Sequence, residues 1–276
     1  MKIINLIENT EGEKECVCAH GLSFYVETEK HKLLMDAGPS RETLENAKAL
    51  GIDLSKVDAV ILSHGHYDHS GGILPFTKIN AQAPIYMQES ATDAYYADDG
   101  EEASVRFRYI GIDKEISKLP QVRFVKGDVK IDEELELFII GKRNHDLPFT
   151  NRRLLVQREN GYRQDEFGHE HFLVIHQDGK SILMSGCAHN GILSILDAYV
   201  KRYGKAPDLV VSGFHLMKKT EYSDSELNEI KAIAEKLKTY PTKFVTCHCT
   251  GTVAFEVMKS IMGECLTYVH SGEIVV

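Results

Sequence analysis

The order of hydrophobic and polar positions predicts strands and helices that alternate along the first half of the chain. Two short apolar runs, 22–27 and 31–36, are joined by a polar turn and predict a pair of strands. Residues 57–63 are almost continuously apolar, which is typical of a strand buried on both faces. A helix is expected in between, with Ser40 as its N-cap and Gly51 as its end. Further strands are expected at 81–87, 122–126 and 135–140.

The second half of the chain repeats this order of elements. A helix is expected to begin at a capping box formed by Ser223 and Glu226 and to end before Pro241. The alternation of strands and helices predicts the α/β class. The other elements expected here are strands at 172–176, 180–185, 208–212 and 243–247, and helices at 191–203 and 252–262.

Two polar segments do not follow the alternation. Residues 88–120 have weak periodicity and are expected to form helix and loop. Residues 142–171 are too long for a simple connection, which is more typical of a functional loop or a cap. Guanidinium groups pair with phosphate through two hydrogen bonds, so the basic residues of this segment favour a small anionic ligand, with a solvated loop as the alternative. These residues are Lys142, Arg143, Arg152, Arg153, Arg158 and Arg163.

Composition and charge narrow the class of protein. The 276 residues are 43% hydrophobic, which predicts a globular chain, and the formal net charge is −9. Such an acidic chain is not expected to bind nucleic acid, because proteins that do so carry a basic footprint. The N-terminus has neither the pattern of a signal peptide nor that of a membrane-spanning helix, so we expect a cytoplasmic protein with reduced cysteines and no membrane partner. A homo-oligomer is compatible with the sequence.

A cluster of metal-ligating side chains follows the buried strand at 57–63. His64, His66, Asp68 and His69 fall within six consecutive positions, although the chain has only 13 histidines in all. Residues i and i+2 of an extended turn project to the same side, so His64 and His66 can bind one divalent ion. Asp68 and His69 lie beyond the bend and face a second ion. An exposed polar loop is the alternative, but four strong ligand types at this spacing favour a metal site.

Three later strands each end in a turn of small residues that carries one histidine. These are His189, His215 and His248. The carboxyl ends of parallel strands lie on one edge of a sheet, where the sites of α/β proteins gather. We therefore expect these histidines to converge on the cluster at 64–69. Each of them alone could instead be an ordinary hydrogen-bonded residue.

Six motifs in this order resemble a known family of enzymes. They are His20-Gly-Leu-Ser23, Asn46-Ala-x-x-Leu-Gly51, Ser63-His-Gly-His-Tyr-Asp-His69, Gly186-Cys-Ala-His189, Gly213-Phe-His-Leu216 and His248-Cys-Thr-Gly251. The sequence resembles the metallo-β-lactamase fold superfamily, and within it the superfamily-II metal-dependent hydrolases that include a dihydropterin-ribofuranosylaminobenzene phosphate synthase. The resemblance implies a four-layer αββα sandwich as one domain over residues 1–276, with a cap-like insertion at about 88–165.

The resemblance also implies a binuclear metal site and assigns residues to it. His64 and His66 match ligands of the first ion, and Asp68 and His69 match ligands of the second. His248 matches the last ligand histidine of the family. Asp36 would orient one of the histidines through a hydrogen bond.

The turn that carries a bridging aspartate in most of the superfamily departs from the family pattern. Gly186, Cys187 and Ala188 stand there without a carboxylate. We expect His189 to be the ligand from this turn, with Cys187 as the weaker candidate. The histidine of the preceding motif stays open between His169 and His171. Two divalent ions are expected, with zinc as the first choice and manganese, iron or nickel as alternatives, because the missing carboxylate weakens the second position.

The function expected from these residues is hydrolysis of a small anionic ester or phosphodiester by a metal-bound hydroxide. Asp68 is the expected proton acceptor, and His215 is expected to bind substrate or to protonate the leaving group, with a purely structural role as its alternative. A nuclease or phosphodiesterase acting on nucleic acid is the second hypothesis, and a non-catalytic metal- or ligand-binding module is the third. A redox di-iron protein of this fold is disfavoured, because it has glutamate in place of His66 and an added flavin domain.

Overall fold

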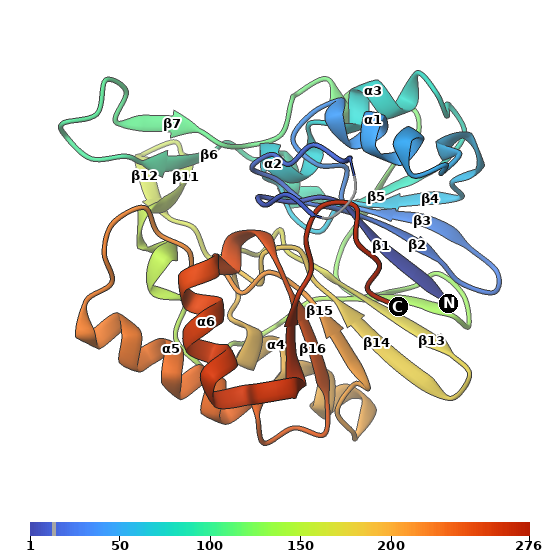
Figure 1. The fold of residues 1–276 in the computed structure, drawn as a ribbon. Helices are drawn as coiled ribbons and strands as arrows, with labels where there is room; N and C mark the ends of the chain where they lie inside the picture. Colours follow the sequence, from blue (N-terminus) through green and yellow to red (C-terminus); the bar gives the residue numbers. More distant parts are fainter. Residues whose placement is uncertain (13–14) are drawn as a thin grey trace.

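Two β-sheets packed face to face form the centre of the molecule (Figure 1). The computed structural model describes residues 1–12 and 15–276. The first sheet has the order β1 (Lys2–Ile7), β2 (Ser23–Glu27), β3 (Lys32–Met35), β4 (Ala59–Ile61), β5 (Ile85–Gln88) and β8 (Val122–Val125). The second has the order β17 (Leu266–Tyr268), β16 (Lys243–Thr246), β15 (Leu209–Val211), β14 (Lys180–Met184), β13 (Phe172–Gln177), β10 (Leu135–Phe138) and β9 (Val129–Lys130).

Each sheet is antiparallel on one side and parallel on the other. In the first sheet β1, β2 and β3 are antiparallel neighbours, whereas β3, β4, β5 and β8 run parallel. In the second sheet β9, β10, β13 and β14 are antiparallel, and β14 to β17 run parallel. The parallel strands expose their carboxyl ends together, so loops that follow them can share one site.

The packing of apolar side chains defines four layers. Residues of both sheets, such as Phe24 and Met184, share one buried cluster between the sheets. The outer face of the first sheet packs against α1 (Glu42–Ala49) and α3 (Ile73–Thr77), where Ala47 and Phe76 are buried. The outer face of the second sheet packs against α4 (Ile192–Tyr203), α5 (Asp224–Leu237) and α6 (Thr252–Met262). The expected four-layer α/β sandwich is therefore confirmed, and Figure 1 shows the helices outside the two sheets.

A third, four-stranded sheet lies beside the sandwich and was not expected. Its order is β12 (Gly161–Gln164), β11 (Leu154–Arg158), β6 (Tyr95–Asp98) and β7 (Phe107–Tyr109). The expectation of helix and loop at 88–120 is therefore wrong for β6 and β7, whereas short helices do lie at Glu89–Thr92 and Ile116–Lys118. In β6, Tyr95 and Ala97 are buried and alternate with partly exposed residues, as in a strand with one buried face. The strand is too short and too polar for this alternation to be recognised in the sequence.

The region 88–165, expected as an insertion, divides between the three sheets. The strands β6, β7, β11 and β12 form the small sheet, whereas β8, β9 and β10 belong to the two sheets of the sandwich. The small sheet therefore comes from two separate stretches of the chain. The organisation into one domain with an insertion stays a prediction.

Smaller differences concern helix ends and short helices. Ser40 is not an N-cap, because α1 begins one residue later than expected, after Arg41, and no side chain caps it. The short helix α2 (Tyr67–Ser70) within the histidine cluster was not expected. Short 3₁₀ helices lie at Leu54–Lys56, Glu89–Thr92, Ile116–Lys118, Phe149–Arg153, His248–Thr250 and Gly263–Cys265.

The chain ends lie side by side at the edge of the first sheet (Figure 1). The N–H of Ile3 donates to the main-chain oxygen of Val276 at 3.0 Å, and Asn5 donates to Glu273 at 2.9 Å. In the described part of the chain, no helix has both the length and the apolar character needed to cross a membrane.

The capping box of α5 supports a test of helix stability. Ser223 Oγ accepts the N–H of Glu226 at 3.3 Å, and Glu226 Oε2 accepts the N–H of Ser223 at 2.8 Å. Because Ser223→Ala removes one of these acceptors, we expect it to lower the free energy of unfolding by about 1 kcal/mol in urea denaturation. Ser225→Ala, an exposed serine inside the same helix, is the control and should lower it little or not at all. Equal losses in the two variants would contradict the cap assignment.

Candidate metal centre

The loops that follow four parallel strands meet at one edge of the sandwich. The segment with His64 to His69 follows β4 of the first sheet, and the turns with His189, His215 and His248 follow β14, β15 and β16 of the second. The ring centroids of His64 and His189 are 4.8 Å apart, and those of His69 and His248 are 5.1 Å apart. The structure thus brings together residues that are far apart in the sequence.

A first group of donors consists of His64, His66 and His189. One ring nitrogen of each lies within 4.8 Å of those of the others, and Nε2 of His64 is 3.3 Å from Nε2 of His189. All three rings are buried. Three imidazoles at this spacing are a donor set that zinc and similar ions accept.

A second group lies beside the first and contains the carboxylate. Asp68 Oδ2 is 3.5 Å from His248 Nε2 and 3.9 Å from His69 Nε2. The same oxygen is 3.4 Å from Nε2 of His20, whose side chain is 52% exposed. Sequence reasoning did not name His20 as a site residue, although one of the family motifs begins with it. The exposed ring of His20 thus contacts the cluster from the solvent side.

Asp36 and Ser63 orient the rings from the first half of the chain. Asp36 Oδ2 lies 2.6 Å from Nδ1 of His69 and accepts the hydroxyl of Ser63 at 2.7 Å. Ser63 Oγ is in turn 2.8 Å from Nδ1 of His64. Because each Nδ1 has a partner, each Nε2 points to the centre as the available donor. The hydrogen bond of Asp36 has the geometry that the family resemblance implied.

Two asparagines orient in the same way the histidine rings that come from the second half of the chain. Asn151 places Oδ1 2.8 Å from Nδ1 of His189 and donates Nδ2 to the main-chain oxygen of His189 at 2.7 Å. Asn9 places Oδ1 2.8 Å from Nδ1 of His248 and donates Nδ2 to the oxygen of His248 at 3.3 Å. Each amide therefore holds both the ring and the main chain of one histidine. No sequence signal pointed to these asparagines, because Asn9 lies 239 residues from its partner.

Unusual backbone conformations gather at this centre. Of the six non-glycine residues with positive φ in the described chain, four are Asp36 (60°), Ala188 (51°), His215 (49°) and His248 (49°). Such conformations cost about 1–3 kcal/mol each and persist where the surrounding structure imposes them. They lie in the turns that present the candidate ligands.

The remaining candidates are placed as follows. The ring of His215 lies tilted against that of His189, with centroids 4.1 Å apart, and its buried Nδ1 has no hydrogen-bond partner among the described residues. His169 has two partners, because Nδ1 accepts the N–H of Gly65 at 2.9 Å and Nε2 contacts Asp165 at 2.9 Å. His171 lies with Nδ1 3.3 Å from the side-chain nitrogen of Gln88. His169 is therefore engaged in holding the loop of the cluster.

Cys187 also lies inside the cluster. Its Sγ is 3.1 Å from Nε2 of His69, and burial raises the pKa of the thiol. The structure therefore places both candidates from this turn, His189 and Cys187, at the centre. Which of the named residues bind a metal ion stays a prediction.

The electrostatics favour neutral imidazoles at most positions. Burial and the neighbouring rings lower the pKa of His64, and burial together with His169 lowers that of His66 to about 3. Burial also acts to lower the pKa of His69, but the carboxylates of Asp36 and Asp68 outweigh it and raise the pKa to about 9. Neutral rings are the form that binds metal ions.

The donor set fits divalent cations. The buried Nε2 atoms of His66 and His248 have no hydrogen-bond partner in the described part of the chain. A buried polar atom without a partner costs about 1–3 kcal/mol, which binding of a cation would offset. Imidazole nitrogens, a carboxylate and a thiol are together the ligands of zinc-type ions.

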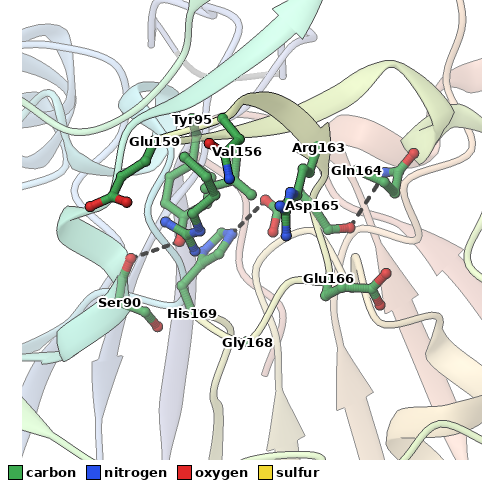
Figure 2. A pocket seen from close by; sticks show the side chains of 12 residues that line it. Ser90, Tyr95, Val156, Glu159, Arg163, Gln164, Asp165, Glu166, Gly168 and His169 are labelled. Atoms are coloured by element: carbon green, nitrogen blue, oxygen red, sulfur yellow. Dashed lines mark hydrogen bonds and ion pairs between the residues drawn. The ribbon is translucent and has the colours of Figure 1, made fainter.

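Two hollows open on the surface beside the cluster. One, of about 650 Å³, is lined by residues that include Tyr95, Arg163, Asp165 and His169, which Figure 2 shows around its opening. The other, of about 730 Å³, is lined by residues that include Lys142. The two hollows share Glu166 and Gly168. The ring of Tyr95 lies 4.1 Å from that of His169 and 5.9 Å from that of His66, so the first hollow borders the cluster.

The chain is similar to several known proteins. The family model of the metallo-β-lactamase superfamily matches residues 17–148. The chain is 29% identical to a 7,8-dihydropterin-6-methyl-4-(β-D-ribofuranosyl)-aminobenzene-5'-phosphate synthase of Methanocaldococcus jannaschii, over 100% of this chain and 96% of that protein. An RNase J-like protein of the same organism is 51% identical over 71 residues, which are 26% of this chain and 15% of that protein.

A solved structure covers the whole chain as well. The crystal structure of Tm1679, described as a metal-dependent hydrolase of the β-lactamase superfamily, superposes with a TM-score of 0.82 and 28% identity, over 100% of this chain and 98% of that one. The agreement extends over the whole chain. Residues 17–148 therefore match the metallo-β-lactamase superfamily, and the chain as a whole has the metallo-β-lactamase fold.

Proposed function

We propose that this protein is a binuclear metal-dependent hydrolase that acts on a small anionic ester or phosphodiester. The observation that carries the proposal is the meeting of buried donors from both halves of the chain, with three close imidazoles beside the carboxylate of Asp68 and its two histidine neighbours. His64, His66 and His189 would hold one ion, and Asp68, His69 and His248 the other. Zinc is the first choice.

The chemistry of such a centre follows from its parts. Divalent ions bound here would lower the pKa of a water molecule and polarise the bond under attack. Asp68 would accept the proton of the attacking water, because its carboxylate lies at the exposed side of the cluster next to His20. His215 would donate a proton to the leaving group, since its Nδ1 lacks a hydrogen-bond partner among the described residues.

The basic residues near the site support a small anionic substrate. Several of them already have carboxylate partners, because Arg143 pairs with Glu166 and Arg158 contacts Asp93 at 2.8 Å. Lys142 and Arg163 line the two hollows beside the cluster. So few basic side chains can bind one phosphate or carboxylate group, whereas a nucleic-acid polymer needs many such contacts. A cytoplasmic location belongs to the same proposal.

A panel of substrates tests the proposed activity. We expect the zinc-loaded protein to hydrolyse at least one member of a set of phosphomonoesters, phosphodiesters, thioesters, lactones and lactams, and to lose that activity on chelation. Re-addition of zinc or manganese should restore it. Absence of metal-dependent turnover across the panel, despite bound metal, would favour a non-catalytic binding module.

The histidine cluster supports a direct test of metal content. His66→Ala removes one donor of the first group, so we expect it to lose at least one ion per chain by elemental analysis and to abolish hydrolysis. His176→Ala replaces a half-buried histidine of β13 outside the cluster and is the matched control. If His66→Ala keeps the metal content of the control, the assignment of His66 is wrong.

The asparagine that holds His189 supports a test of positioning. Asn151→Ala frees the ring of His189, so we expect metal affinity to fall about 10–100-fold in competition with a chelator. Asn151→Asp keeps an acceptor for Nδ1 and should recover part of the affinity. Asn228→Ala, on the exposed face of α5, is the control and should keep it. An unchanged affinity in Asn151→Ala would show that the ring does not depend on this amide.

A nuclease is the second candidate, favoured by the 71-residue match to the RNase J-like protein. The net charge of −9 counts against a polymer substrate, because nucleic-acid affinity depends on many contacts between basic side chains and phosphates. We expect no cleavage of short RNA or DNA strands by the zinc- or manganese-loaded protein, measured on labelled oligonucleotides. Metal-dependent cleavage that His66→Ala removes would replace the small-molecule proposal with this one.

A further inference from the structure

We propose that the sulfur of Cys187 is the ligand that links the two cation positions of this centre. The proposal rests on the proposed function, because it assumes that both groups of donors bind ions. It goes beyond the proposed function because it assigns a source of negative charge to the turn at 186–188, which has no carboxylate. It also assigns a preference for thiophilic cations.

The position of the sulfur carries the proposal. Cys187 belongs to one group of close donor atoms with His64 and His69, and to another with His189 and His215. It belongs to a third with His248 and Cys249, and within each group the donor atoms lie within 4.8 Å of one another. His64 and His189 are donors of the first ion, whereas His69 and His248 are donors of the second. The sulfur therefore lies between the two positions.

The histidine nitrogens next to the sulfur of Cys187 have few other partners. The buried Nε2 of His248 has no hydrogen-bond partner among the described residues, and its distance to the carboxylate of Asp68 is 3.5 Å. His69 Nε2 is 3.1 Å from the sulfur, a separation that suits two ligands of one ion. The side chain of Cys187 is itself buried, at 3% exposure. The thiol is thus buried next to a donor that has no hydrogen-bond partner among the described residues.

The local backbone is built to place this sulfur. Ala188 has a φ of 51°, which turns the chain so that Cys187 and His189 reach the same centre. A Cβ atom at Gly186 would lie 2.2 Å from Ser63 Oγ, so glycine allows the turn to approach the side chains that orient His64 and His69. The carboxylate of Glu170 accepts the N–H groups of His189 at 2.8 Å and Asn190 at 2.9 Å. The turn is therefore held from several sides.

Charge supplies the physical reason for a thiolate. Asp36 and Glu170 are buried nearby, but their oxygens accept hydrogen bonds from Ser63, His69, His189 and Asn190. Asp68 joins the second group of donors and Asp165 lies near His66, but the turn at 186–188 has no carboxylate to separate two dications, which repel each other strongly. A coordinated thiol loses its proton to solvent and adds an anion at this turn. Sulfur favours zinc, cobalt and cadmium over manganese and magnesium.

The second thiol of the region has a different role. Cys249 Sγ accepts the N–H of His215 at 3.3 Å and lies 3.6 Å from the main-chain oxygen of Cys187, to which it donates. A Cβ atom at Gly213 would come within 2.5 Å of this sulfur. Cys249 therefore connects the turns that follow β14 and β15 through main-chain contacts. It is a positioning residue, and Cys249→Ser provides a matched control for Cys187→Ser.

Cobalt(II) loading of the full chain tests the proposal without an activity assay. We expect the wild type to bind two cobalt ions per chain and to show the intense near-ultraviolet absorption of a thiolate-to-cobalt transition. Cys187→Ser should lose this absorption and one of the ions. Cys187→Asp should bind two ions without the absorption and should shift the preference from zinc toward manganese, because a carboxylate is a harder ligand. Cys249→Ser should keep the absorption. Circular dichroism confirms that each variant is folded.

The outcomes separate this proposal from the proposed function. Two bound cobalt ions without a thiolate transition in the wild type would overturn the role of Cys187 and leave the binuclear centre intact. The same conclusion follows if Cys187→Ser keeps both the second ion and the absorption, or if Cys249→Ser loses the absorption instead. A wild type that binds no cobalt would overturn both proposals.

Discussion

The burial of many imidazole groups at one edge of the sandwich is the constraint on which the rest of this structure depends. Six of the candidate ligands are at most 8% exposed, and the ring nitrogens that face one another come from loops that follow strands of both sheets. Removing such groups from water costs about 1–3 kcal/mol for each one without a partner. The fold offsets part of this cost through hydrogen bonds to Nδ1 of four of the rings, and it leaves their Nε2 atoms for cations.

The partners of the rings differ between the two halves of the molecule. In the first half a carboxylate and a hydroxyl, Asp36 and Ser63, hold His69 and His64. In the second half the neutral amides of Asn151 and Asn9 hold His189 and His248. Amides orient a ring without adding charge, so neither His189 nor His248 has a carboxylate at Nδ1 as His69 does. In the proposed coordination, the sulfur of Cys187 would supply negative charge next to these rings.

The chain orders its backbone around the same centre. Positive φ angles at Asp36, Ala188, His215 and His248 occur in the turns that follow four parallel strands. Each is unfavourable by itself and is imposed by the packing of the strands and by hydrogen bonds such as those of Glu170. The small sheet adds a further wall, because Gly111, just after β7, bridges to the main chain of His66. The site is therefore a product of all three sheets.

The sequence by itself determined the elements whose signals are local. The apolar run before His64, the spacing of the cluster at 64–69 and the capping box at Ser223 depend on neighbouring residues, and the structure has each of them. The alternation of strands and helices likewise predicted parallel strands whose ends carry His189, His215 and His248. Backbone geometry and amphipathic patterns involve only a few neighbouring residues, so they can be recognised in the sequence before the fold is known.

Tertiary structure decided what depends on distant contacts. The small sheet joins residues 95–109 to residues 154–164, and its strands are too short and polar to be distinguished from loops. Asn9 and Asn151 have no local feature that separates them from surface asparagines, and Cys187 was the weaker candidate until the fold placed its sulfur among the histidines. The physical reason is that hydrogen bonds and ligand geometry are set by separations of a few ångströms between side chains, which only the packing of the two sheets defines.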